Sequence, residues 1–288
     1  MHNNSIVAGI DIGGSHITAA LIDLQNTTVL KETCVRKSID TNGSGTTIIN
    51  EWSSVINKVF SGFDYPKKIG IAMPGPFDYE KGISLIRNQN KFDSLYGLNI
   101  KKLLAERLQI NEIDILFKND AACFLQGEAF GGAAKGCKIA IGLTLGTGLG
   151  SARFSNGNAE DADLWHSPFL EGIAEDYLST RWFVKRFYEI SGKTILNVKE
   201  LRELKSQDNS VNKIFKEFGI NLAFFLSGLI DIEKPEVIVL GGNIANAYPL
   251  FYSELFFNLP NSGYPFLIKK SALGENGNLI GAGSCWYH

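Results

Sequence analysis

The sequence lacks an excess of charge of either sign. Its 28 Lys and Arg residues nearly balance its 30 Asp and Glu residues, which gives a net charge of −2. A chain with so little net charge has no general attraction for nucleic acid or for an anionic membrane surface. We therefore expect neither of these as a partner.

Long hydrophobic runs are also missing. The longest uncharged stretches, Ile139–Ala152 and Phe218–Ile230, are shorter than the ~20 apolar residues that a membrane-spanning helix needs. The N-terminus has no Lys or Arg ahead of an apolar region, as a secretory signal would have. These features favour a cytoplasmic protein.

Cysteine and proline are scarce. The four cysteines are scattered without CxxC spacing, which favours reduced, mostly buried thiols over disulfides or a zinc site. Only 8 residues are proline, whereas 30 are glycine. Because a linker would be rich in both, the glycine excess is expected to serve particular turns.

The residues that are present indicate a globular α/β protein. Hydrophobic residues make up 44% of the 288 residues and charged residues 20%, which is typical of a packed chain of about two domains. In the first part, strands are expected at 6–12, 17–22, 27–35, 68–73 and 113–117, and helices at 48–60 and 100–108.

The same order then recurs. A strand at 139–144, a glycine-rich turn at 146–150, a second strand, a helix-rich middle and a strand at 237–240 follow one another. The chain therefore reads as a doubled α/β unit with two lobes along an interdomain cleft. The predicted lobes are residues 1–117 together with a C-terminal helix at about 276–288, and residues 118–275.

Two glycine turns could bind phosphate. Asp11 ends a buried strand and is followed by Gly13-Gly14-Ser15, where the backbone N–H groups can approach an anion. An ordinary hairpin turn is the alternative. The turn Gly146-Thr147-Gly148 adds a hydroxyl. It is followed by a strand-like segment, which excludes the dinucleotide fingerprint, and it lacks the GK[ST] of a P-loop.

Three further segments could carry chemistry. Asn119-Asp120 falls where a strand meets a helix, so Asp120 could be a helix N-cap, a general base, or both. Asp163, His166 and Glu175 could pair with sugar hydroxyls, or they could be a helix cap and a surface histidine. Gly241-Gly242 ends a buried strand, where the backbone could approach an adenine ring or simply turn.

In this order the motifs resemble those of the ROK family (repressors, open reading frames, kinases). The resemblance covers nearly the whole chain. It implies the actin-like ATPase fold, in which two ribonuclease H-like lobes bind ATP and a hexose in the cleft between them. It further implies a homodimer and an ATP-dependent kinase that phosphorylates glucose or a related sugar at the 6-hydroxyl.

The resemblance also implies roles for individual residues. Asp11 would hold Mg²⁺ through water. The ATP phosphates would contact Gly13, Gly14, Ser15, Thr147 and Gly148, and the adenosine would contact Gly241 and Gly242. The sugar would be bound by Gly75, Asn88, Asn119, Asp120, Asp163, His166 and Glu175, with Asp120 as the catalytic base.

The sequence departs from the family pattern in its sugar segment. The zinc-binding cysteines are missing, Asp163 replaces a glutamate, and Trp165 replaces a glycine. No zinc site is therefore expected, and the accepted hexose stays open. A sugar-sensing protein that has lost phosphoryl transfer, or an ATPase for a non-sugar, is the alternative. The repressors of the family carry a helix-turn-helix ahead of the first strand. Because the first strand here begins near Ser5, we do not expect direct reading of DNA.

Overall fold

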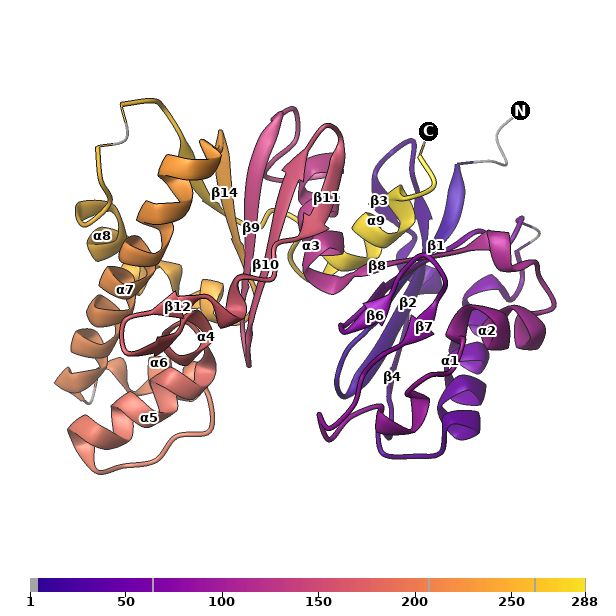
Figure 1. Cartoon of the computed structure of the whole chain (residues 1–288), viewed down its shortest axis with the longest axis horizontal. Coiled ribbons are helices and arrows are strands. Elements are labelled where there is room, and N and C mark those ends of the chain that lie inside the picture. The colour runs from indigo at the N-terminus through magenta and orange to yellow at the C-terminus, as the bar shows by residue number, and fades with distance from the viewer. Residues whose placement is uncertain (1–4, 64, 207, 262, 288) are drawn as a thin grey trace. The chain divides into compact units, whose positions relative to one another are not determined.

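The structure is a computed structural model that describes residues 5–63, 65–206, 208–261 and 263–287. The chain divides into two compact units, both drawn in Figure 1. Unit 1 comprises Met1–Lys135 and Glu275–His288, and unit 2 comprises Gly136–Gly274. The sequence suggested that the first lobe ends at residue 117. In the structure, the chain leaves unit 1 only after Lys135.

A mixed sheet forms the centre of unit 1. Its strand order is β3-β2-β1-β5-β8, with β4 also paired to β2. The strands are β1 (Ile6–Ile12), β2 (His16–Asp23), β3 (Thr28–Val29), β4 (Val35–Ser38), β5 (Ile69–Met73) and β8 (Ile115–Asn119). The β1–β2 hairpin is antiparallel, and β1, β5 and β8 run parallel. The carboxyl ends of these parallel strands therefore lie at one edge of the sheet.

The single strand expected at 27–35 is wrong. The segment is divided into β3, a 3₁₀ turn (Lys31–Thr33) and β4. The Thr33 hydroxyl donates to the Leu30 carbonyl (2.7 Å) and accepts from the Leu21 amide (2.8 Å). Because this side chain takes the place of a backbone partner on β2, the strand is interrupted there.

The helices of unit 1 begin at identifiable caps. Helix α1 (Gly45–Phe60) is capped by Ser44, and α2 (Ile100–Leu108) by Asn99. Helix α1 packs on the sheet and α2 packs against α1. Trp52 and Phe92 are among the largest fully buried side chains of this core. A small hairpin, β6 (Phe77–Asp78) with β7 (Ile83–Ser84), precedes α2. Strand β8 starts later than residue 113 because Glu112–Asp114 forms a 3₁₀ turn.

Two helices with glycine-rich contacts complete unit 1. Helix α3 (Asp120–Gly131) packs against α9 (Gly277–Ser284), as Figure 1 shows. A Cβ at Gly281 would overlap the Cys123 carbonyl, and one at Gly127 would overlap the Gly277 carbonyl. This backbone-to-backbone packing joins α3 to the first unit, which explains why the division falls after Lys135. Residue 288 of the predicted tail helix lies outside the described residues.

Unit 2 repeats the strand arrangement. Its sheet has the order β11-β10-β9-β14-β15. The strands are β9 (Ile139–Leu145), β10 (Leu149–Ser155), β11 (Asn158–Asp161), β14 (Val237–Gly241) and β15 (Leu267–Lys270). As in unit 1, an antiparallel hairpin, β9–β10, is followed by parallel pairing of β9 with β14.

Helices cover one face of this second sheet (Figure 1). They are α4 (Ala174–Tyr177), α5 (Thr180–Ser191), α6 (Val198–Glu203), α7 (Asn209–Glu233) and α8 (Tyr248–Phe257). A second small hairpin pairs β12 (Pro168–Phe169) with β13 (Gly172–Ile173). The core between helices and sheet is rich in phenylalanine, with Phe183, Phe215, Phe218 and Phe251 fully buried. No helix among the described residues is long and apolar enough to span a membrane.

Candidate functional site

The turn between β1 and β2 is open on its outer side. The Gly13 amide donates to the His16 carbonyl (2.9 Å), which closes the turn. A Cβ would lie 3.6 Å from its nearest heavy atom at Gly13 and 3.8 Å at Gly14, and neither glycine has a positive φ. The fold therefore has room for side chains here. Because the Gly13 amide is already bonded, glycine at both positions leaves the N–H group of Gly14 accessible to a ligand.

His16, which the sequence analysis did not single out, orients the hydroxyl of Ser15. The Ser15 hydroxyl lies 2.8 Å from His16 Nδ1, and the Ser38 hydroxyl lies 3.0 Å from His16 Nε2. The β2–β4 register places His16 opposite Ser38. Both ring nitrogens are therefore engaged, and the ring orients Ser15 beside the glycine turn.

Asp11 lies near the carboxyl end of β1. Its Oδ1 accepts from Asn278 Nδ2 (3.0 Å) on α9. Burial raises the pKa of this carboxyl, the Asn278 hydrogen bond opposes that shift, and the nearby Asp120 carboxylate reinforces it. The sequence could not indicate Asn278, because it lies 267 residues away along the chain.

The surroundings of Asp11 fit a magnesium ion bound through water. Mg²⁺ typically keeps several waters and takes only one or two protein carboxylates. Asp11 presents one such carboxylate, and its Oδ2 has no hydrogen-bond partner among the described residues. No group of three or more His, Cys, Asp or Glu side chains in the described ranges could hold a metal ion.

Asn119, and not Asp120, is the N-cap of α3, which was one of the two roles that the sequence left open for Asp120. Asn119 is the N-cap of α3, since its Oδ1 accepts from the Ala122 amide (3.1 Å). Asp120 is the first helical residue, and its carboxylate accepts from the Ala121 amide (2.9 Å). The interpretation of Asp120 as the cap is therefore wrong. Its half-buried carboxylate is available for other chemistry.

The environment of Asp120 suits a proton acceptor. Burial raises the pKa of its carboxyl, while the Ala121 hydrogen bond and the positive charge of Lys91 oppose the shift. A carboxylate whose pKa lies closer to neutrality is a stronger general base than an ordinary surface aspartate.

A tyrosine joins two of the predicted sugar residues. Asn119 Nδ2 donates to the Tyr79 hydroxyl (3.2 Å), which donates to the Met73 carbonyl (3.1 Å). The same hydroxyl would lie 3.3 Å from a Cβ at Gly75. The structure therefore brings Gly75 and Asn119 together around Tyr79, which the sequence analysis missed.

Asn88 lies on an exposed loop that is anchored from behind. Asn88, Asn90 and Phe92 all have positive φ values, between 55° and 59°. Phe92 is fully buried and packs edge-on against Trp52 at 5.5 Å between ring centres. The anchored loop holds Asn88 at the surface of unit 1, with its side chain free to meet a polar ligand.

In unit 2, the turn between β9 and β10 has open space beside its first glycine. No heavy atom lies within 4 Å of a Cβ at Gly146, whose φ is not positive. The Gly146 carbonyl accepts from both the amide (2.8 Å) and the hydroxyl (2.9 Å) of Thr180. The turn is thus held from the α5 side and stays open where Thr147 is exposed.

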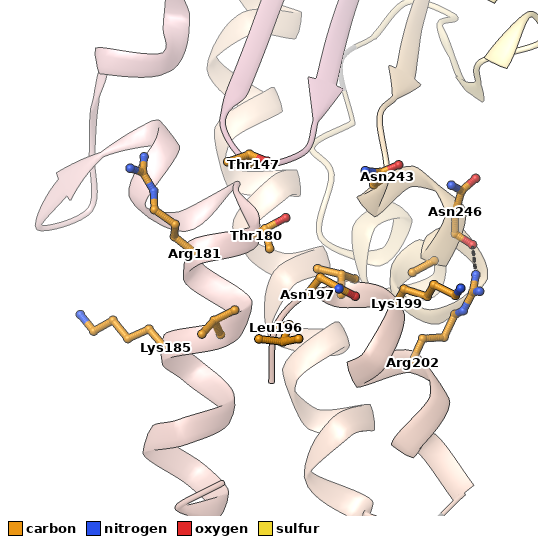
Figure 2. A pocket seen from close by; sticks show the side chains of 13 residues that line it. Thr147, Thr180, Arg181, Lys185, Leu196, Asn197, Lys199, Arg202, Asn243 and Asn246 are labelled. Atoms are coloured by element: carbon orange, nitrogen blue, oxygen red, sulfur yellow. Dashed lines mark hydrogen bonds between the residues drawn. The ribbon is translucent and has the colours of Figure 1, made fainter. Parts of the chain in front are cut away.

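A pocket of about 690 Å³ lies within unit 2 (Figure 2). That volume is in the usual range for a small-molecule site. Its lining combines Thr147 and Thr180 with residues of α5, α6 and the 3₁₀ turn Ile244–Ala247. It includes no acidic side chain but four cationic ones, which are Arg181, Lys185, Lys199 and Arg202.

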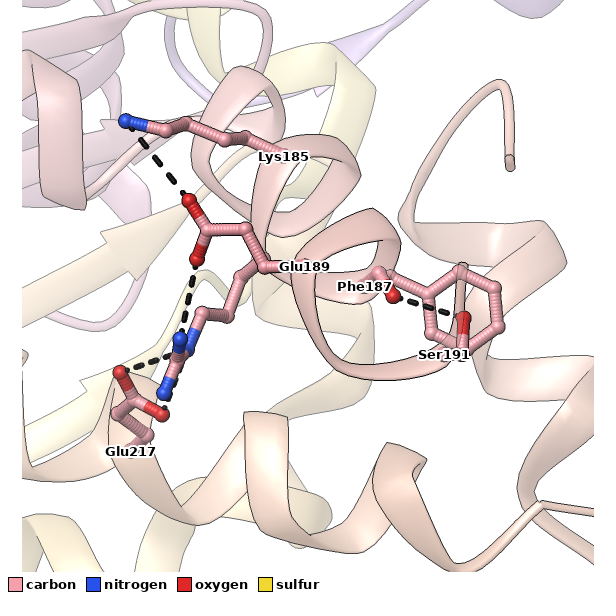
Figure 3. A network of polar contacts seen from close by, with 6 residues as sticks. Lys185, Phe187, Glu189, Ser191 and Glu217 are labelled. Carbon is pink, nitrogen blue, oxygen red and sulfur yellow. Dashed lines mark hydrogen bonds and ion pairs between the residues drawn. The ribbon is translucent and has the colours of Figure 1, made fainter. Parts of the chain in front are cut away.

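The charges of this pocket are unevenly paired. Lys185 lies 3.9 Å from Glu189, as Figure 3 shows. Glu189 also pairs at 3.0 Å with Arg186, which is outside the pocket lining and bonds Glu217 as well. Arg181 pairs with Glu175. Among the described residues, the pocket's remaining cations, on α6, form no ion pair. The pocket therefore presents positive charge to an anionic ligand.

Gly241 and Gly242, the predicted adenosine contacts, lie next to this pocket in the chain but do not line it. Asn243, Asn246 and Ala247 line it instead. Gly242 has a φ of +81°, and a Cβ there would overlap the Leu145 backbone. The fold therefore requires glycine at position 242. The Gly241-Gly242 motif indicates the pocket only because Asn243, Asn246 and Ala247 follow it in the chain.

The sugar segment of unit 2 is divided. Asp163 Oδ1 accepts from Trp165 Nε1 (2.7 Å) and lies 3.5 Å from His166 Nδ1, so these three side chains form one exposed cluster. Glu175 is not part of it. Its carboxylate accepts from the Leu149 amide (3.0 Å) and pairs with Arg181.

The chain is similar to known sugar kinases over nearly its whole length. An N-acetyl-D-glucosamine kinase of Histophilus somni is 28% identical over an alignment that covers 95% of this chain and 96% of the relative. A glucokinase of Thermotoga maritima is 25% identical, with 96% and 95% covered.

Solved structures show the same fold. A ROK family glucokinase from Streptomyces griseus, in complex with glucose and AMPPNP, has a TM-score of 0.78 at 19% identity, with 97% of this chain and 98% of that chain covered. A ROK hexokinase from Thermus thermophilus also gives 0.78, at 21% identity and 96% coverage of each chain. The expected actin-like ATPase fold is thereby confirmed.

The sequence model of the ROK family matches residues 7–161. This match spans more than half of the chain and includes the Gly13-Gly14 turn, the Asn119-Asp120 pair and the Gly146–Gly148 turn. The chain belongs to the ROK family.

Proposed function

We propose that this protein is an ATP-dependent hexose kinase with Asp120 as its general base. The observation that carries the proposal is the state of Asp120, a half-buried carboxylate at the start of α3 whose capping role is taken by Asn119. Burial raises the pKa of this carboxyl, as a base that works near neutral pH requires.

In the proposed reaction, the carboxylate of Asp120 accepts the proton of the sugar 6-hydroxyl. The sugar oxygen then forms a bond to the terminal phosphorus of ATP as the bond to the bridging oxygen breaks, and ADP leaves. Asn88, Asn119 and Gly75 in unit 1 and Asp163 and His166 in unit 2 are the proposed sugar contacts. The resemblance also places Glu175 among them.

The donor contacts follow from the two open turns. Beside Gly13, whose own N–H is bonded to the His16 carbonyl, Gly14 and Ser15 offer N–H and O–H groups to phosphate oxygens. Thr147 and Gly148 do the same in unit 2. Adenosine would enter the pocket of unit 2 beside Asn243, next to Gly241 and Gly242. When bound near Asp11, Mg²⁺ would neutralise charge on the phosphates.

Glucose and N-acetylglucosamine are the first sugars to test, because relatives of both specificities match nearly the whole chain. A coupled ADP-release assay should compare them with mannose, N-acetylmannosamine, fructose and allose. Sugar-dependent ADP release is expected for at least one. Saturable sugar binding without turnover would instead favour the sugar-sensing alternative. A homodimer and a cytoplasmic location stay predictions.

A further inference from the structure

Trp165 is an exposed aromatic residue that lies between two of the proposed sugar contacts. It is in the 3₁₀ turn Leu164–His166, which directly follows Asp163. Trp165 is 45% exposed, whereas the other three tryptophans of the chain are buried or half-buried. A single exposed aromatic residue is not unusual, so its surroundings decide whether it has a role.

The backbone that carries Trp165 is anchored to unit 2 on both sides. The Leu164 amide donates to the Ser151 hydroxyl on β10 (2.9 Å), and the Leu164 side chain packs against the core. The Asp163 amide donates to the Asp161 carboxylate (2.9 Å), and Asp163 has a φ of +51°. Because a positive φ is uncommon outside glycine, these contacts hold the turn in its shape.

The indole is oriented by its two neighbours. Its Nε1 donates to Asp163 Oδ1 (2.7 Å), and its ring meets the His166 ring edge-on, with 5.0 Å between ring centres. Asp163 Oδ2 has no hydrogen-bond partner among the described residues. A side chain that is already held in place loses little rotamer freedom when a ligand packs on it. The cluster is therefore preorganised for a ligand although it lies outside the core.

A hexose in its chair form offers two kinds of surface to this cluster. Its hydroxyls donate and accept hydrogen bonds, which Asp163 Oδ2 and the His166 ring can match. Its ring C–H groups form an apolar face on which an aromatic ring can pack, provided that the ring hydroxyls are equatorial. An axial hydroxyl on that face would point at the indole, where it loses water without gaining a full partner.

We propose that Trp165 packs on the sugar ring and selects hexoses whose substituents at C2, C3 and C4 are all equatorial, as in glucose and N-acetylglucosamine. The inference rests on the proposed kinase function, because that function places the sugar beside Asp163 and His166. It goes further by naming a residue that determines which sugar is accepted.

The first test compares Trp165→Leu and Trp165→Phe with the unaltered protein in the ADP-release assay. Trp165→Leu should raise the KM for the preferred sugar by about tenfold, because an aromatic contact is lost. The KM for ATP should change less than about twofold. Trp165→Phe should show a smaller rise, since it keeps a ring. The matched control is Tyr188→Leu, which removes another exposed aromatic side chain of unit 2, outside the pocket lining and the proposed sugar contacts.

The same variants test the selection between sugars. The unaltered protein should prefer glucose or N-acetylglucosamine to mannose and allose, whose hydroxyls at C2 and at C3, respectively, are axial. Trp165→Leu should reduce this preference, measured as a ratio of kcat/KM values, by about tenfold. A preference for mannose or allose in the unaltered protein, or an unchanged sugar KM in Trp165→Leu, would overturn the inference.

Intrinsic fluorescence without ATP separates the inference from the kinase function. Because Trp165 is the only exposed tryptophan of the four, a sugar that packs on it should shift the emission to shorter wavelength, and Trp165→Leu should lack the shift. If no sugar is phosphorylated but glucose or N-acetylglucosamine causes the shift, the inference stands and the kinase function fails. If a sugar is phosphorylated with the same KM in Trp165→Leu, only the inference fails. If neither turnover nor a shift occurs, both fail. Equal melting temperatures would show that the variants fold.

Discussion

Asn278 donates a hydrogen bond to Asp11 across 267 residues of sequence, with 3.0 Å between Nδ2 and Oδ1. Asn278 lies on α9, the C-terminal helix that returns to unit 1. The last helix of the chain therefore orients a carboxylate on the first strand. The proposed magnesium site thus depends on the packing of α9 in unit 1.

Replacing Asn278 with alanine should weaken this link. The free energy of unfolding should fall by about 1 kcal/mol, because one hydrogen bond to a half-buried carboxylate is lost. Turnover should fall as well, since Asp11 would no longer be held in one orientation. Chemical denaturation and the ADP-release assay measure the two effects. Asn276→Ala, an exposed residue just before α9 that makes no side-chain cap bond, is the control.

Asp120→Asn should retain nucleotide affinity and lose turnover by ~10² or more, because the amide has the size of the carboxylate but cannot accept the proton. Single-turnover measurements together with analogue binding would show this separation. A variant with nearly the rate of the unaltered protein would exclude Asp120 as the base.

The same residue should couple stability to pH. Burial raises the pKa of Asp120 above the ordinary value of 3.8, so the native state binds this proton more readily than the unfolded state does. Its ionisation therefore lowers stability above the native pKa, and this loss is recovered as the pH falls from the native pKa toward the ordinary value. At neutral pH, Asp120→Asn should melt higher than the unaltered protein, and the difference should shrink in acid. Melting curves of both proteins from pH 4 to pH 8 would test this. A difference in melting temperature that grows in acid would contradict the prediction.

Two glycine-to-alanine changes should affect different properties, one the stability of the protein and the other its binding of ATP. Gly281→Ala should destabilise the protein by about 1–3 kcal/mol, because the new Cβ would overlap the Cys123 carbonyl. Gly146→Ala should leave the melting temperature nearly unchanged, because no heavy atom lies within 4 Å of its Cβ position, but it should raise the KM for ATP. If Gly146→Ala unfolds the protein, or binds ATP normally, the turn is not an open phosphate site.

Much of the fold could be predicted from local patterns. Continuous apolar runs placed β1, β5 and β14 to within a residue or two, and helical spacing placed α1 and α2. Site residues at turns were also accessible, since glycine pairs after buried strands are visible in the sequence. The division of the segment at 27–35 was not, because it depends on the Thr33 side chain meeting Leu21 on another strand.

The glycine excess shows the limit of such reasoning most clearly. The sequence suggested that the telling glycines serve ligands. Gly13, Gly14 and Gly146 are consistent with that, but Gly127 and Gly281 pack α3 against α9. A glycine that admits a ligand and one that admits a neighbouring backbone look alike in sequence, because both are defined by what lies opposite the missing side chain.

The sequence by itself determined the strands, the turns and the family to which their order points, because apolar periodicity and turn residues act over a few neighbouring positions. Only the tertiary structure decided which groups meet: Asn119 caps α3 in place of Asp120, Asn278 bonds Asp11, and Glu175 lies between the Leu149 amide and Arg181. These pairings depend on the packing of elements distant in sequence, and hydrogen bonds between such elements have no local pattern to announce them.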